Sequence, residues 1–413
     1  MRLNTILFLA FAASGFLAAA ENPAEVDPAD QRIADAQKAL RSNPGSADSH
    51  LNLAAELCRK ARDSEDIAYY GQAEAEVESA LKLAPGNYDA KKLEVTILLG
   101  RNEFDAALKL AAELNKKIPD DIALWGLLAQ IHAAIGNYQE AVRDAQWVLD
   151  LRPGSALGFT EAARLREAYG DAEGAIEFYD EARRRTALSD AEERAWLLTQ
   201  VARLTGDKKR AGALFEEARK TNPASQLAIA GLARLRMTEG NYSEVVALLE
   251  KRFKVAHSAR NLYDLAEALE GAGRKDEAAS AFQEFETKAL GETERPYNAN
   301  IELIGYYLDR KSNPAEALAI AKRESAVRHD SRTMAALAWA LFANSRYEEA
   351  RMRMEDALAT GQRNAGYFCH AAHIAAALND AEHAKEFQKE SLSLDSGACS
   401  VELPVASLQE GKK

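Results

Sequence analysis

A six-residue pattern recurs along the chain at a nearly constant interval. Its clearest copy is "GNYQEA" (136–141), and the other copies begin with Gly, Asn or Ser and end with Ala or Val. These copies are "NEFDAA" (102–107), "GDAEGA" (170–175), "GDKKRA" (206–211), "GNYSEV" (240–245), "GRKDEA" (273–278), "SNPAEA" (312–317), "SRYEEA" (345–350) and "NDAEHA" (379–384). Successive copies start 33 to 39 residues apart, most often 34. A period of this length predicts a stack of helical units, not an enzyme fold.

Proline and glycine mark the turns between the expected helices. Proline cannot continue a helix, so one proline per unit predicts the end of the second helix of that unit. These prolines are Pro44, Pro85, Pro119, Pro153 and Pro223. The Gly or Asn at the start of the repeated pattern predicts the other turn, between the two helices of one unit, where a left-handed residue ends the first helix. The segment before Pro44, "RIADAQKALRSNP", predicts a lone second helix.

Residues 122–155, "IALWGLLAQIHAAIGNYQEAVRDAQWVLDLRPGS", resemble the tetratricopeptide repeat family. The slots that the family pattern expects are filled by Trp125, Leu128, Ala129, Gly136, Tyr138, Ala141 and Pro153. His132 takes the place of the first-helix Tyr, so the match is not complete. The resemblance extends over residues 31–395 in about ten units. It implies an all-α fold, a right-handed superhelical solenoid of helix-turn-helix repeats, in which each unit buries its apolar face against its neighbours.

The rest of the chain falls outside this solenoid. We expect a signal peptide at 1–20, a polar spacer at 21–30 and a C-terminal tail at 396–413. Two units are longer than the others, through "RDSEDIAYYGQ" (62–72) and "ETERPYNAN" (292–300). Each lengthening predicts either a longer loop or helix, or a hinge between two halves of the solenoid. The second places a break near 290–298.

Small residues are expected where the two helices of a unit cross. In the clearest unit these are Ala129 in the first helix and Ala141 in the second, and a bulkier side chain at either position would push the helices apart. Neighbouring units keep small residues in the corresponding slots, among them Ala163, Ala175, Ala182, Ala211, Ala218, Ala233, Ala266, Ala278, Gly305, Ala317, Ala338, Ala350 and Ala357.

The resemblance also implies a binding groove. In this family the concave surface is lined by particular slots of the first helix. Here those slots hold Gln130, Arg164, Glu167, Trp196, Gln200, Arg203, Arg234, Tyr263, Glu267, Glu302, Tyr306, Trp339 and Phe342. Aromatic and Arg side chains are typical of binding hot spots, so we expect the groove to hold an extended segment or a helix of another protein. For any single position the alternative is packing against the next unit.

The N-terminus and the net charge bear on location and partners. One Arg, an apolar run from Ile6 to Leu17 and the small residues 18–20 predict a secretory signal cleaved after Ala20, with an uncleaved anchor as the alternative. We therefore expect a soluble exported protein of the periplasm or extracellular space, with no membrane insertion after cleavage. The formal net charge of −12 disfavours nucleic acid and anionic lipid.

Three cysteines remain. Cys58 is expected to be buried and unpaired, whereas Cys369 and Cys399 lie close enough in sequence for the tail to fold back and form a disulfide in an oxidising compartment. The alternative is that they stay unpaired.

One cluster resembles a metal site. It consists of Cys369, His370, His373 and His383, joined by Glu386. His370 and His373 are one helical turn apart, but the spacing matches no established metal-binding pattern. We therefore expect no metal and no cofactor.

Nothing in the sequence predicts catalysis. It holds no Gly-rich phosphate loop after a strand and no nucleophile elbow, so we expect no catalytic residues. The sequence is best interpreted as a non-enzymatic scaffold for interactions with other proteins, whose identity it does not give. The aromatic groove residues also permit a carbohydrate- or peptidoglycan-associated binding protein of an envelope or polysaccharide-export system. An enzyme built on the His-rich last unit is a third interpretation.

Overall fold

The computed structural model describes residues 28–359, 361, 363–394 and 399–401. These residues form 21 helices and no strand. The expectation of an all-α solenoid is therefore confirmed for the described part of the chain. The expected signal peptide (1–20) lies outside the described residues, as do most of the spacer (21–30) and most of the tail (396–413).

The helices alternate between first and second members of ten pairs, after a lone helix α1 (Pro28–Ser42). The first helices are α2 (Ala47–Ser64), α4 (Tyr88–Gly100), α6 (Ile122–Ala134), α8 (Ala156–Ala168), α10 (Ala191–Leu204), α12 (Gln226–Thr238), α14 (Ala259–Gly271), α16 (Asn300–Asp309), α18 (Ser331–Ala343) and α20 (Ala365–Ala377). The second helices are α3 (Ala68–Leu83), α5 (Phe104–Asn115), α7 (Tyr138–Leu151), α9 (Ala172–Arg185), α11 (Lys208–Thr221), α13 (Tyr242–Val255), α15 (Lys275–Leu290), α17 (Pro314–Ser325), α19 (Tyr347–Leu358) and α21 (Ala381–Leu394). Each helix contacts the next one along the chain.

Side-chain caps fix where many first helices begin. Ser46 accepts a hydrogen bond from the backbone N–H of Ser49 at 3.2 Å, and Asn87 accepts one from Ala90 at 2.9 Å. A cap of this kind satisfies a backbone donor that has no partner within the helix. The prolines predicted to end second helices follow them closely: Pro85 lies two residues after the end of α3, Pro153 two after α7 and Pro119 four after α5.

The turn between the two helices of a unit contains a left-handed residue, as predicted. Its φ is +84° at Gly136 and +63° at Asn102. Ala129 of α6 and Ala141 of α7, the small residues expected where these two helices cross, are only 2% and 0% exposed. Their burial agrees with close packing of the two helices. Trp125 closes the outer end of the same unit, where its Nε1 donates to the carbonyl of Pro119 at 2.8 Å and its ring stacks on Trp147.

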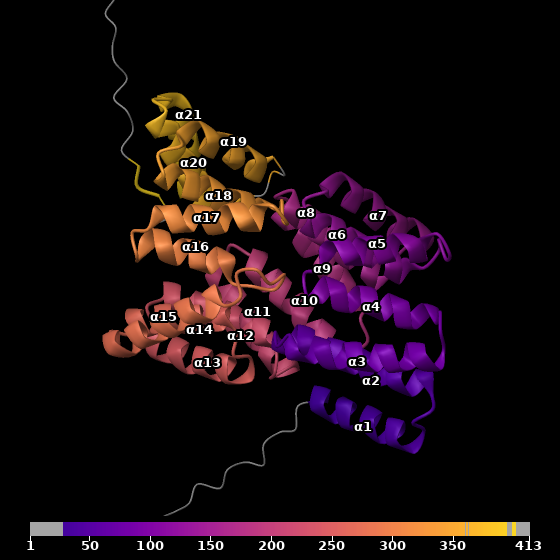
Figure 1. The fold of residues 1–413 in the computed structure, drawn as a ribbon. Helices are drawn as coiled ribbons and strands as arrows, with labels where there is room; N and C mark the ends of the chain where they lie inside the picture. Colours follow the sequence, from indigo (N-terminus) through magenta and orange to yellow (C-terminus); the bar gives the residue numbers. More distant parts are fainter. Residues whose placement is uncertain (1–27, 360, 362, 395–398, 402–413) are drawn as a thin grey trace, which may run out of the picture.

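The superhelix winds until later units meet earlier ones. Figure 1 shows α1–α7 on one side of the molecule and α13–α21 on the other, with α8–α12 linking them. In three successive early units, the loop between the two helices of the unit contacts a loop of a late unit. Asn102 Nδ2 donates to the carbonyl of Pro296 at 3.4 Å, and a Cβ placed on Gly136 would lie 2.7 Å from the carbonyl oxygen of His329. A Cβ placed on Gly170 would lie still closer to the carbonyl oxygen of Gly361.

Charged side chains join further pairs of distant units. Arg32 of α1 pairs with Glu192 of α10, and Arg62 of α2 lies 3.5 Å from Glu193. Contacts of this kind hold the superhelix closed, because its winding brings charged side chains of distant units within reach of one another.

The two long units are accommodated differently. In the first, the extra residues extend the helices, since α2 has 18 residues and α3 has 16. In the second, they form the loop between α15 and α16, and the carbonyl of Pro296 in that loop also accepts a hydrogen bond from Arg328 at 3.0 Å. This loop is thus part of the contact between turns. Among the described residues, no helix combines the length and apolar character that crossing a bilayer requires.

Candidate binding cavity

Two adjoining cavities lie along the inner wall of the superhelix. The larger has a volume of about 980 Å³ and is lined mainly by the first helices α10, α12, α14, α16, α18 and α20. The smaller, of about 440 Å³, extends toward α6 and α8. Both are lined by Gln200, Arg203, Arg332 and Tyr367, so we treat them together as the interior cavity.

Most of the groove residues expected from the sequence line this interior cavity. They are Gln130, Arg164, Glu167, Trp196, Gln200, Arg203, Arg234, Tyr263, Glu302 and Trp339. The slots of the first helix therefore bring together residues that are up to 209 positions apart in the sequence.

Three expected groove residues do not line the interior cavity. Tyr306 is 4% exposed and packs against Phe282 and Phe285, while its hydroxyl lies 3.2 Å from Glu286. Phe342 stacks behind Trp339. The third, Glu267, lies 3.8 Å from Arg310 at the edge of α14.

The charges in the larger cavity are arranged around buried carboxylates. Glu302, whose side chain is 8% exposed, accepts from Arg260 at 3.0 Å and from Arg332 at 2.7 Å. Burial by itself would raise the pKa of Glu302, but the two guanidinium groups outweigh it and hold this pKa below its usual value. Arg252 pairs with Asp264 at 2.6 Å, but there burial outweighs the guanidinium and raises the pKa of the Asp264 carboxyl group.

Basic side chains outnumber acidic ones in this cavity. Six basic side chains, Arg203, Lys208, Arg234, Arg252, Arg260 and Arg332, line it together with the four carboxylates of Glu65, Asp264, Glu302 and Asp309. Arg234 and Lys208 form no ion pair with any residue in the described ranges. The cavity is therefore basic although the whole chain carries a formal charge of −12.

Aromatic rings form another part of the wall. Trp339 of α18 lies between two parallel rings, with His370 at a centroid distance of 4.0 Å and Phe342 at 4.7 Å. Burial lowers the pKa of His370 to about 4, so this imidazole is neutral near pH 7. The guanidinium of Arg164 lies over the ring of Trp196 at 4.7 Å, a cation–π contact.

The smaller cavity contains a buried carboxyl group. Glu161 is 2% exposed and accepts a hydrogen bond from Gln130 Nε2 at 2.8 Å, with Arg164 at 3.8 Å. Burial raises the pKa of Glu161 to about 7, because these partners only partly replace the lost solvation. Its charge state therefore changes near neutral pH.

Sequence reasoning missed several residues of the cavity wall. Arg260 and Arg332 lie in the first turns of their helices, outside the slots that the repeat pattern marks. Arg252 lies on a second helix and pairs at the wall with Glu65, which is 187 residues earlier in the chain. The repeat pattern holds no signal for such a pair, since it describes contacts between neighbouring units.

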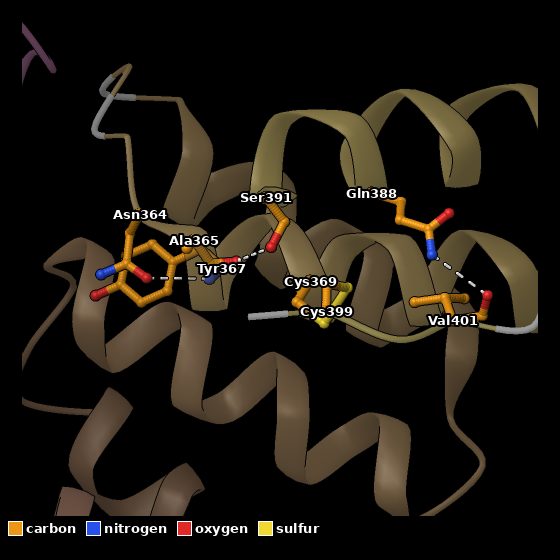
Figure 2. The surroundings of a disulfide bond; sticks show 8 residues. All are labelled: Asn364, Ala365, Tyr367, Cys369, Gln388, Ser391, Cys399 and Val401. Atoms are coloured by element: carbon orange, nitrogen blue, oxygen red, sulfur yellow. Dashed lines mark hydrogen bonds between the residues drawn. A yellow bond between two sulfur atoms is a disulfide. The ribbon is translucent and has the colours of Figure 1, made fainter. Parts of the chain in front are cut away.

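Cys369 and Cys399 form a disulfide, which joins α20 to the segment after α21 (Figure 2). Nearby hydrogen bonds hold the same elements together: Gln388 donates to the carbonyl of Val401 at 3.4 Å, and Ser391 donates to the carbonyl of Ala365 at 2.8 Å. Cys58 is buried and free, and burial raises the pKa of its thiol to about 12.

The metal-like cluster of the last unit does not gather as a whole. His383 is exposed and its Nδ1 lies 2.7 Å from Asp380, whereas His370 faces the interior cavity. The structure instead places His373 beside the disulfide of Cys369 and Cys399.

Comparisons with known proteins bear on the fold. Tetratricopeptide repeat models match residues 70–131 and residues 365–397. The comparison with curated protein sequences found no match. These two matches place the family pattern near both ends of the solenoid.

Solved structures resemble the chain over most of its length. The crystal structure of the APC/C hetero-tetramer Cut9–Hcn1 is similar over 89% of this chain, with a TM-score of 0.51 and 14% identity, and the match covers 60% of that protein's chain. The human IFIT1 dimer with PPP-AAAA has a TM-score of 0.47 at 13% identity, over 88% of this chain and 95% of that one. A tetratricopeptide repeat protein from Parabacteroides merdae has a TM-score of 0.41 at 17% identity, over 60% and 96%. At such identities the similarity concerns the fold alone.

Proposed function

The chain belongs to the tetratricopeptide repeat family, and we propose that it is a non-catalytic scaffold whose interior cavity binds an extended segment of another protein. The observation that carries the proposal is the gathering of ten expected groove residues along one cavity. Its larger part, at about 980 Å³, is at the upper end of the range for ligand sites, so it has room for several side chains of a partner.

The chemistry of the wall selects the kind of segment. Arg234 and Lys208 are cations without an ion-pair partner among the described residues, and the aromatic side chains of Trp339 and Tyr263 line the same cavity. A segment that carries carboxylates and an apolar or aromatic side chain would satisfy both features. Charge complementarity of this kind also speeds association and disfavours basic partners.

A peptide-binding experiment tests this proposal. A library of synthetic peptides that combine acidic and aromatic residues is screened by fluorescence polarisation against the full chain, beside the same peptides with Lys in place of Asp and Glu. We expect binding of acidic peptides only, weakened at least about tenfold by Arg234→Glu and by added salt. The control Lys82→Glu reverses an exposed charge on α3 that lines neither cavity and is expected to change nothing.

Two results would contradict the proposal. Equal affinity of acidic and Lys-containing peptides would show that the basic wall does not select the partner. Binding of peptidoglycan fragments or other glycans, with no peptide binding, would favour the alternative of a carbohydrate-associated binding protein. Melting curves of each variant separate lost binding from lost folding.

Export is part of the proposed function. It is supported by the signal-like pattern of residues 1–20 and by the disulfide of Cys369 and Cys399, since structural disulfides persist mainly in oxidising compartments. We expect cell fractionation to find a mature chain that begins at Glu21 in the periplasm or the medium. An intact Met1 in the mass spectrum of the purified native protein would contradict cleavage.

A further inference from the structure

Three ligating side chains of the last unit converge at the disulfide. Cys369 and His373 are four residues apart on α20, so they share one face of that helix. Cys399 reaches the same face from the segment after α21 (Figure 2). The two sulfurs and the nearest ring nitrogen of His373 all lie within 4.8 Å of one another.

We infer that, once the disulfide is reduced, Cys369, Cys399 and His373 form a Zn²⁺ site. Two thiolates and one imidazole are ligands that Zn²⁺ prefers, and three protein ligands leave one position open to water. With bonds of about 2.0–2.3 Å to Zn²⁺, ligand atoms in a tetrahedral site lie roughly 3.5 Å apart, so the three side chains need only small movements. The inference does not depend on the proposed function.

The surroundings favour this site in the folded chain. Cys369 is 8% exposed, so its sulfur is shielded from bulk water. The ring of His373 rests near Trp339 and Phe342, at centroid distances of 5.8 and 6.2 Å, which restricts its orientation. No residue in the described ranges forms a hydrogen bond with either of its nitrogens, so none of them competes with a metal there.

The chemistry balances with a dithiol as the reductant. The Cys369–Cys399 bond accepts two electrons and two protons from the dithiol, which becomes a disulfide, and two thiols result. Binding of Zn²⁺ to both sulfurs then releases the two thiol protons, because the thiolate is the ligand. In the reverse exchange a small-molecule disulfide accepts the two electrons and two protons from solution, becomes two thiols, and the Cys369–Cys399 bond re-forms, which would expel the metal. The pair would therefore alternate between a disulfide and a zinc site.

Zinc titration of the full chain tests the inference. The protein is reduced with a phosphine, since thiols themselves bind Zn²⁺, and then titrated in competition with a chromophoric chelator. We expect the reduced chain to bind one Zn²⁺ and the oxidised chain to bind at least 100-fold more weakly. Cys399→Ser and His373→Ala are each expected to weaken binding at least tenfold. Spectra with Co²⁺ in place of Zn²⁺ should show thiolate bands that Cys399→Ser diminishes.

Two matched controls are available. His383→Ala removes an exposed imidazole of the same unit, and Cys58→Ala removes the remaining thiol of the chain; neither should change zinc affinity. Circular dichroism melting shows whether the reduced chain keeps its last unit folded. Three outcomes would overturn the inference: no zinc binding by the reduced chain, unaltered affinity in His373→Ala, or a last unit that unfolds on reduction even with zinc present.

Discussion

Arg252 connects two turns of the superhelix by donating from Nη2 and Nε to one carboxylate oxygen of Glu65, at 2.5 and 3.2 Å. Its Nη1 donates to Asp264 at 2.6 Å, and the Arg252 residue is only 3% exposed. Burial would lower the pKa of Arg252, but the two carboxylates raise it, so this guanidinium stays charged. One buried cation therefore joins α13 and α14 to the end of α2.

Removing this cation should destabilise the whole superhelix. We expect Arg252→Met to reduce the free energy of unfolding by about 3–5 kcal/mol, because it leaves two partly buried carboxylates without their partner. Urea unfolding monitored by circular dichroism measures the loss. The control Arg274→Met breaks only exposed pairs, with Glu277 of α15 and Glu250 of α13, and should have little effect. An equally small effect of Arg252→Met would contradict a stabilising role for the pair.

Gly136 and Gly240 occupy the same position in two "GNY" loops. Comparing substitutions at the two positions distinguishes the cost of a left-handed backbone from the cost of a clash with the next winding of the superhelix. Their φ angles are +84° and +76°, but a Cβ on Gly136 would meet the carbonyl of His329, whereas a Cβ on Gly240 would meet nothing within 4 Å. We expect Gly240→Ala to cost about 1–2 kcal/mol from the left-handed backbone. Gly136→Ala should cost a further 1–3 kcal/mol or so, because the next turn of the superhelix must move. Equal losses in thermal melting would show that the turns do not touch there.

The buried carboxyl group of Glu161 makes stability depend on pH. Its folded pKa of about 7 lies above the ordinary value of 4.5, so the folded state holds a proton that the unfolded state has lost between these two values. Stability should therefore fall as pH rises from about 4.5 to 7. We expect Glu161→Gln to be more stable than the natural chain at pH 8, by up to about 3 kcal/mol, and to differ little at pH 4.

Melting temperatures across this pH range test the effect. Gln at position 161 keeps an oxygen that can accept from Gln130, so the substitution removes the charge and preserves the hydrogen bond. Glu173→Gln, on the neighbouring helix α9, replaces another carboxylate and serves as the control. A difference between natural chain and Glu161→Gln that is the same at pH 4 and pH 8 would contradict the raised pKa.

The crossing of α6 and α7 should not tolerate a larger side chain. Ala141 is 0% exposed, so we expect Ala141→Leu to force the helices apart and to cost about 1–3 kcal/mol. Val142, the next residue, is 39% exposed, and Val142→Leu adds volume where there is room. Equal melting temperatures of Ala141→Leu and Val142→Leu would contradict close packing of α6 and α7 at Ala141.

Local contacts follow directly from the repeat pattern. The lone helix before Pro44, the left-handed turn at Gly136 and the buried Ala129 and Ala141 all lie where the sequence predicts them. They do so because each depends on residues of one unit or of the next one along the chain. Ten groove residues also line one cavity, since a first-helix slot points to the same side in every unit.

The sequence by itself determined the helical units, their turns and the inward side of each first helix, because these depend on backbone preferences and on contacts between neighbours in the chain. Only the tertiary structure decided that the superhelix closes, that Arg252 meets Glu65, and that His373 lies beside the sulfurs of Cys369 and Cys399. The physical reason is the accumulation of small rotations. The sequence predicts the angle between neighbouring units only weakly. Summed over several units, however, this angle decides which distant side chains meet.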